Sequence, residues 1–311
     1  MSDDASTGSA AGGSAVAAEG SAPAAEVAAP ARVGVLGGGR MGAGIAHAFV
    51  LAGSQVVVVE RDETTADAAA SRIRASLARS VERGATRASL AELEDALTSG
   101  TDAALLAGCT LVIEAVPEDR SLKVEALARA EAVLPAGAVL ASNTSSISID
   151  DLAGELARPA RFLGLHFFNP VPASALVEVV AGSATDAALI EDARGWVEAL
   201  GKTAIVVRDS PGFASSRLGV ALGLEAIRML EEGVASAADI DAAMTLGYRH
   251  PVGPLRTTDL VGLDVRLGIA EELHAKLGAR FEPPALLRRM VAEGKLGRKS
   301  GAGFYSWEND R

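Results

Sequence analysis

The 311-residue chain lacks several features on which whole classes of protein depend. It has a single cysteine, Cys109, so no disulfide can form within the chain. No stretch of about 18 apolar residues runs without a charge or a Gly or Pro break, which argues against a membrane span. The first 30 residues hold no Lys or Arg and no continuous apolar run, so we expect no secretory signal. These absences predict a protein of the reducing cytoplasm.

Positive charge is also scarce over the chain as a whole. The formal net charge is −11 and the sequence pI is about 5.0. An acidic surface repels phosphate backbones, so we expect no nucleic-acid partner. The His, Cys, Asp and Glu residues show no metal-ligand spacing, and we predict no metal site. Cys109 lies in an apolar run and is expected to be a small core residue.

Length and composition predict about two domains behind an N-terminal tail. Residues 1–30 consist mainly of Ala, Gly, Ser and Pro with a few acids. This composition cannot bury enough apolar surface to offset the entropy lost on ordering. We therefore expect residues 1–30 to be a disordered tail.

The pattern after the tail alternates between strand and helix. Short β-rich runs occur at 32–36, 55–60, 111–115, 139–141, 161–167, 176–180 and 204–207, and helical patterns at 40–52, 64–83, 87–98 and 119–134. Such alternation predicts βαβ units and a mostly parallel sheet. The fold class is therefore α/β, with an N-terminal Rossmann-type dinucleotide-binding domain over residues 31–208.

The pattern changes after Asp209. Helical patterns follow one another at 212–231, 236–246, 258–278 and 283–293, and the only later strand is expected at 303–305. We predict an all-α C-terminal domain over residues 209–311, with a boundary near residue 208.

A glycine-rich turn follows the first strand. Gly37, Gly39 and Gly42 match G-x-G-x-x-G where a strand gives way to a helix, and Glu60 follows the second strand. Gly37 allows a tight turn, Gly39 lets the backbone approach a pyrophosphate, and Gly42 lets helix and strand pack closely. A carboxylate at Glu60 binds ribose hydroxyls and repels a 2′-phosphate, so NAD is predicted rather than NADP. The neighbouring Arg61 softens that discrimination.

A histidine and an acid stand on two neighbouring predicted strands. His166 ends one strand, where Rossmann-type sheets bind ligands, and Glu178 lies inside the apolar run 176–180. A buried acid is costly unless it is paired. A carboxylate on one ring nitrogen would orient the imidazole for proton transfer during hydride transfer from an alcohol. From these residues alone, a structural histidine is an equally good interpretation.

A set of motifs along the chain resembles the L-3-hydroxyacyl-CoA dehydrogenase family, near its short-chain 3-hydroxybutyryl-CoA members. The resemblance covers about residues 32–306. Its motifs are GGGRMGAGIA at 37–46, ASNTSS at 141–146, GLHFFNPVP at 164–172, LVEVV at 176–180, DSPGF at 209–213, HPVGP at 250–254 and GRKSGAGFY at 297–305.

The resemblance implies a set of roles. His166 would be the catalytic base, Glu178 its partner, and Ser145 a contact of the reacting substrate oxygen. The NAD site would include Glu118, Lys123, Asn169 and Lys299 together with Met41 and Asn143, and the CoA site would include Ser76 and Arg83. Members of this family pair through the C-terminal domain, so a homodimer and an acyl-CoA substrate are also implied.

One position departs from the family pattern. Where the family usually has Asn followed by Arg after DSPGF, this chain has Ser216 followed by Arg217. Serine keeps one donor but reaches less far, which leaves open how the substrate carbonyl is held and which acyl group is preferred. Three alternatives follow: a 3-hydroxyadipyl-CoA dehydrogenase of phenylacetate breakdown, a gulonate-type hydroxy-acid dehydrogenase, and a catalytically silent NAD-binding protein.

Four other polar residues have structural interpretations. His47 is expected to serve packing or to lie at the surface, and His250 to belong to a rigid Pro-rich turn. Asp259 and Asp264 are expected to be caps or interface contacts rather than catalytic groups.

Overall fold

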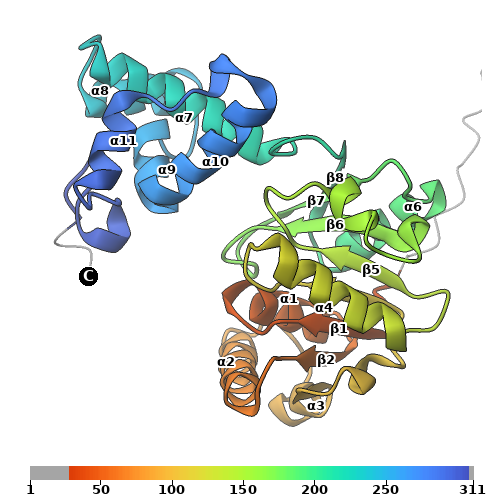
Figure 1. Cartoon of the computed structure of the whole chain (residues 1–311). Helices are drawn as coiled ribbons and strands as arrows, with labels where there is room; N and C mark the ends of the chain where they lie inside the picture. Colours follow the sequence, from red (N-terminus) through yellow and green to blue (C-terminus); the bar gives the residue numbers. More distant parts are fainter. Residues whose placement is uncertain (1–27, 308–311) are drawn as a thin grey trace, which may run out of the picture.

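The computed structural model describes residues 28–307, which form a sheet with flanking helices and a separate group of helices (Figure 1). This arrangement confirms the predicted fold class, a Rossmann-type α/β domain followed by an all-α domain. The expected disordered tail lies almost wholly outside the described residues. None of the helices between residues 28 and 307 combines the length and the apolar character needed to cross a bilayer.

Eight strands form one sheet in the order β3-β2-β1-β4-β5-β6-β7-β8. The strands are β1 (Arg32–Leu36), β2 (Gln55–Val59), β3 (Leu97–Gly100), β4 (Leu111–Glu114), β5 (Val139–Ser142), β6 (Phe162–Phe167), β7 (Leu176–Ala181) and β8 (Thr203–Arg208). The first six are parallel, whereas β7 pairs antiparallel with β6 and β8 is parallel to β7. The strand order turns at β1, which lies between β2 and β4, and open sheets bind ligands at such a turning point.

Helices cover both faces of the sheet. Helices α1 (Arg40–Leu51), α2 (Glu63–Glu82) and α6 (Ala187–Ala199) pack in one apolar core, and α4 (Arg120–Val133) and α5 (Ile149–Ala153) in a second. Strand β2 is an unbroken valine run because Val56 and Val58 enter the first core while Val57 and Val59 enter the second.

Residues after β8 form the helical part with its own core. Its helices are α7 (Ser215–Glu231), α8 (Ala237–Ala242), α9 (Pro254–Val261), α10 (Leu263–Leu277) and α11 (Ala285–Ala292). Helix α8 continues into a π-helical turn over Ala243–Gly247.

Three expectations about local structure were wrong. The segment 87–98 is not one helix: α3 (Leu90–Asp95) ends early, and Leu97 begins edge strand β3 because it pairs with β2. The segment 258–278 is two helices, because Gly262 adopts φ +105° between α9 and α10. Residues 303–305 form no strand; isolated bridges join Ala302 to Gly297 and Ser306 instead.

The buried carboxylate of Asp259 fastens the end of the described chain to α9. It accepts hydrogen bonds from the backbone N–H groups of Phe304 and Tyr305 at 2.9 Å and from the indole of Trp307 at 2.8 Å. Asp259 is 1% exposed, so these donors take the place of water. Its role is structural, as its sequence context indicated.

We predict that Asp259→Ala lowers the free energy of unfolding by about 3 kcal/mol, because three donors, of which the Trp307 indole is buried, lose their acceptor. Urea denaturation would measure the change. The exposed Asp192 on α6 provides the control, since Asp192→Ala removes a carboxylate without buried partners. Equal stability of the two variants would contradict the anchoring role.

Candidate active site

The turn between β1 and α1 has the geometry of a pyrophosphate cradle. Gly37 has φ +87°, in the left-handed region that favours glycine. A Cβ on Gly42 would lie 1.8 Å from the carbonyl oxygen of Gly37, so only glycine allows this packing. A Cβ on Gly39 would meet nothing within 4 Å, which leaves the backbone open at the start of α1, where free N–H groups bind anions.

A cavity of about 570 Å³ continues from this turn across the ends of β1 and β2. Gly37, Gly39, Met41 and Glu60 line one side of it, and α4 lines the other through residues that include Leu122. One carboxylate oxygen of Glu60 accepts a hydrogen bond from the Gly38 N–H at 2.6 Å, which orients the acid at the rim. A glycine turn, a helix N-terminus, an apolar cavity and an acid after the second strand together fit the adenosine half of NAD.

His166 and Glu178 meet across β6 and β7. The antiparallel register sets the two residues directly opposite each other. His166 Nδ1 and Glu178 Oε2 lie 2.7 Å apart, with the residues 6% and 0% exposed. The rings of Phe168 and Phe213 flank the imidazole at centroid distances of 4.5 and 5.7 Å. Within residues 28–307, Nε2 has no hydrogen-bond partner, so it can serve a reacting group.

Glu178 is held ionised by its donors. Burial alone would raise the pKa of this carboxyl, but the His166 hydrogen bond and the Ser215 donors together lower it. The backbone N–H groups of Ala214 and Ser215 donate to Oε1 at 3.1 and 2.8 Å, and the Ser215 hydroxyl donates to Oε2 at 2.8 Å. An ionised carboxylate stabilises an imidazolium, so the pair is suited to take up a proton.

Ser215 is a site residue that the sequence motifs did not single out. The sequence drew attention to its neighbour Ser216, which occupies the family Asn position. The structure gives Ser215 the contact with Glu178, while the Ser216 side chain makes no hydrogen bond within the described part of the chain. An Asp-Ser-Pro-Gly-Phe turn immediately before a helix was the available signal, because the first N–H groups of a helix favour a carboxylate.

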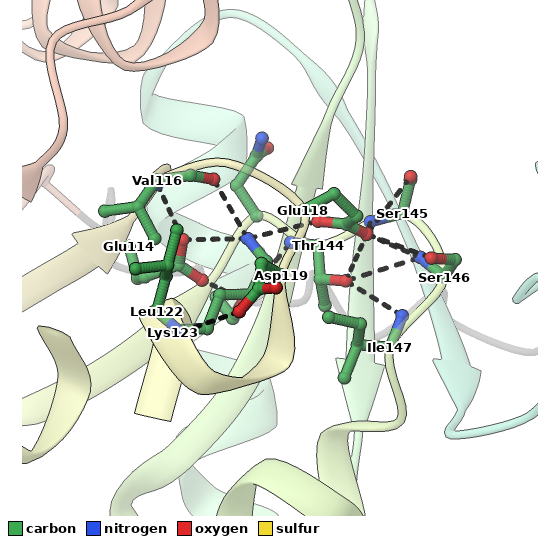
Figure 2. A network of polar contacts seen from close by, with 12 residues as sticks. Glu114, Val116, Glu118, Asp119, Leu122, Lys123, Thr144, Ser145, Ser146 and Ile147 are labelled. Atoms are coloured by element: carbon green, nitrogen blue, oxygen red, sulfur yellow. Dashed lines mark hydrogen bonds and ion pairs between the residues drawn. The ribbon is translucent and has the colours of Figure 1, made fainter. Parts of the chain in front are cut away.

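A second polar cluster lies at the carboxyl ends of β4 and β5 (Figure 2). Glu118 Oε1 accepts hydrogen bonds from Thr144 Oγ1 at 2.6 Å, from Ser145 N at 2.9 Å and from Ser146 N at 3.1 Å. The ammonium of Lys123 lies 3.1 Å from the other oxygen of Glu118. The turn that carries Ser145 is therefore held by an acid from the preceding β-α connection.

The remaining predicted residues lie on several elements. Asn143 links β5 to β6, because its side-chain oxygen accepts a hydrogen bond from Phe167 N at 2.8 Å. Asn169 is exposed just after β6. Ser76 and Arg83 lie seven residues apart on and after α2, so they share one helix face. Lys299 belongs to the helical part, where its ammonium pairs with Asp264 at 2.6 Å.

The histidines outside the pair have structural surroundings. His47 on α1 is 3% exposed, and its Nε2 lies 2.8 Å from Ser80 Oγ on α2. Burial and the nearby Arg79 lower the pKa of His47, which keeps it neutral between the helices. His250 is half-buried in the loop before α9, where its backbone N–H donates to Met244.

The lowered pKa of Glu178 predicts a pH-dependent contribution to stability. A carboxyl that ionises more readily in the folded state stabilises it fully above its unfolded pKa, and this stabilisation disappears as the pH falls through the lower folded pKa. The difference in unfolding free energy between the wild type and Glu178→Gln should therefore shrink as the pH falls below about 4.5, the ordinary value. Urea denaturation between pH 7 and 3 measures it. The exposed Glu191→Gln is the control, and a difference that grows on acidification would refute the assignment.

Comparison with known proteins connects this geometry to a family. The NAD binding domain of 3-hydroxyacyl-CoA dehydrogenase matches residues 32–210, and the C-terminal domain of 3-hydroxyacyl-CoA dehydrogenase matches residues 212–307. Together these matches cover nearly all of the described chain.

Individual relatives are similar over the same region. A 3-hydroxybutyryl-CoA dehydrogenase of Mycobacterium tuberculosis is 45% identical over 282 residues, covering 89% of this chain and 98% of the relative. A probable 3-hydroxybutyryl-CoA dehydrogenase of Bacillus subtilis is 40% identical over 276 residues, covering 88% and 96%. The crystal structure of (S)-3-hydroxybutyryl-CoA dehydrogenase PaaH1 from Ralstonia eutropha has a TM-score of 0.86 at 38% identity, covering 90% and 99%. The chain therefore belongs to the 3-hydroxyacyl-CoA dehydrogenase family, whose NAD-binding domain and C-terminal domain it carries in order.

Proposed function

We propose that this protein oxidises the 3-hydroxyl of a short-chain (S)-3-hydroxyacyl-CoA, 3-hydroxybutyryl-CoA above all, to the 3-oxoacyl-CoA, reversibly and with NAD. The observation that carries this proposal is the buried His166–Glu178 pair, whose free Nε2 lies at the strand ends of a dinucleotide-binding sheet. The names of the relatives from Mycobacterium tuberculosis and Ralstonia eutropha support the substrate.

The side chains of the site would move and hold the proton. His166 Nε2 takes the proton of the C3 hydroxyl as the C3–H bond breaks, and Glu178 stabilises the imidazolium that forms. Ser145 donates a hydrogen bond to the same oxygen, which fixes its direction. In the reverse reaction, the imidazolium returns the proton to the ketone oxygen. When bound, NAD supplies the acceptor for the hydride that leaves C3.

The other predicted roles extend this proposal. Gly37, Gly39, Met41, Gly42 and Glu60 would bind the adenosine side of NAD, and Glu118, Lys123, Asn143, Asn169 and Lys299 would shape its nicotinamide side. Ser76 and Arg83 would contact CoA from one face of α2. Ser216 would face the acyl group, and the domains would divide near residue 208. A cytoplasmic enzyme of acyl-CoA or fatty acid metabolism fits the single cysteine and the bacterial relatives.

The test is an absorbance assay at the NADH band with acetoacetyl-CoA. The wild type should oxidise NADH, and His166→Gln should lower kcat by about 100-fold to 10,000-fold because the proton donor is lost. NADH affinity, measured by fluorescence, should change by less than about twofold. His250→Gln is the control and should keep wild-type turnover.

Two results would count against the proposal. A wild type that does not oxidise NADH with acetoacetyl-CoA would favour a catalytically silent NAD-binding protein or a gulonate-type dehydrogenase. Normal turnover by His166→Gln would remove His166 from the reaction. A panel of acyl-CoA substrates that includes a dicarboxylic 3-hydroxyadipyl member would fix the acyl preference beside Ser216.

We also infer a homodimer formed through the helical part. Its surface carries most of the large hydrophobic side chains that are exposed in the described chain: Leu218, Val234, Leu246, Tyr248, Leu260, Val261 and Val265. Leu246 and Tyr248 are 82% and 76% exposed. Seven of the nine large hydrophobic side chains exposed within residues 28–307 lie on this part, and we therefore assign the contact to it.

Leu218→Glu should shift the protein from dimer to monomer in sedimentation velocity, because Leu218 on α7 is 71% exposed and a charge there would be costly to bury. Val206→Glu is the control: it places the same charge on β8, where Val206 is 44% exposed, and should leave the mass unchanged. A monomeric wild type would exclude this dimer.

A further inference from the structure

Glu114 is a buried carboxylate that the proposed reaction does not use. It ends β4 and is 0% exposed, next to the end of β5, where the parallel register sets it beside Ser142. Its Oε2 accepts a hydrogen bond from the Ser142 hydroxyl at 2.5 Å. Its Oε1 accepts one from Val116 N at 2.7 Å and one from Lys123 Nζ at 2.8 Å. Both oxygens are therefore fixed by neighbours on three sides.

Lys123 is equally enclosed. Its residue is 1% exposed. Its ammonium donates hydrogen bonds to Glu114 and to the carbonyl oxygen of Val116 at 3.2 Å, and it forms an ion pair with Glu118 at 3.1 Å. The Lys123 side chain is 2% exposed and lies between these three groups, so little of it is open to a ligand. Lys123 therefore acts from behind the site, as the link between two carboxylates, and Figure 2 shows it lying between Glu114 and Glu118.

The carboxylates of Glu114 and Glu118 differ in burial and in the groups that donate hydrogen bonds to them. Glu114 faces the protein interior, and burial raises its pKa despite the nearby Lys123. Glu118 lies at the surface side of Lys123 and accepts hydrogen bonds from the turn of Thr144, Ser145 and Ser146. A continuous path of hydrogen bonds and one ion pair, between Lys123 and Glu118, thus runs from Ser142 through Glu114 to Ser145.

We propose that Glu114 is a positioning residue for Ser145, acting through Lys123 and Glu118. Neutralising Glu114 would leave the buried ammonium with one carboxylate and two neutral acceptors, and the ammonium would move toward Glu118 to recover its pairing. The carboxylate of Glu118 would then turn away from the amides that it holds. Ser145 would lose its fixed direction although no residue that contacts the substrate had changed. This inference rests on the proposed function only where it assigns Ser145 to the substrate oxygen.

A double-mutant cycle between Glu114 and Ser145 tests the catalytic side. In the acetoacetyl-CoA assay, Glu114→Gln should lower kcat/KM by about tenfold or more, as losses of supporting contacts do. In a Ser145→Ala background, Glu114→Gln should cost less than about twofold, because the group that it positions is already gone. NADH affinity measured by fluorescence should stay within about twofold. Glu191→Gln on α6 is the matched exposed control.

Hydrogen exchange tests the structural side without turnover. The amides of Ser145 and Ser146 donate to Glu118, so their exchange in the intact protein should be at least about tenfold faster in Glu114→Gln than in the wild type. The amides of β1 and β2 provide the internal control and should exchange as before. Should Glu114→Gln fail to fold, Glu114→Asp keeps the charge but shortens the reach to Lys123, and the same two measurements apply.

The outcomes separate the two proposals. A wild type that is inactive on acetoacetyl-CoA refutes the proposed function, and the exchange rates then decide the positioning role alone. With an active wild type, losses from Glu114→Gln and Ser145→Ala that multiply independently overturn the inference. Unchanged exchange at the Ser145 and Ser146 amides in Glu114→Gln also overturns the inference, because it excludes an effect transmitted through Glu118.

Discussion

The site depends on one hydrogen bond across two antiparallel strands. His166 and Glu178 can form this hydrogen bond because β7 runs against β6 and sets them in direct register. A parallel strand at this position would need a crossover connection over the sheet, whereas β6 and β7 are joined by a loop over residues 168–175. The reversal of strand direction thus places a base and its acid on neighbouring strands, 12 residues apart in sequence.

The sheet holds two buried carboxylates, Glu178 and Glu114, whose surroundings shift their pKa values in opposite directions. The pKa of Glu178 is lowered because the His166 hydrogen bond and the Ser215 donors at the start of α7 outweigh burial, whereas the pKa of Glu114 is raised because burial outweighs Lys123. The first helix after the sheet therefore contributes to the site as well as to the helical core. Its backbone N–H groups at Ala214 and Ser215 connect the two parts of the chain at the acid that orients the base.

The strand alternation, the glycine turn and the final helices could be predicted from the sequence because each depends on local periodicity or on a single glycine position. The edge strand β3 could not, since Leu97 to Gly100 have little strand character and gain it from pairing with β2. The break at Gly262 was missed because one glycine does not show whether its φ is positive. The sequence indicated that His166 and Glu178 could pair. It did not show that β7 runs antiparallel to β6, which is what sets the two residues opposite each other. Ser215 and Glu114 were missed because their partners lie 37 and 28 residues away.

The anchoring of Asp259 has a consequence for how the chain is made. Its nearest donor, Phe304 N, lies 45 residues further along the sequence. Several seconds therefore pass between the synthesis of Asp259 and that of its first hydrogen-bond partner. The sheet, whose strands all precede it, is complete by then. The contacts that fasten α9 to residues 304–307 can form only after these residues have been synthesised, so they are among the last contacts of the helical part to be made.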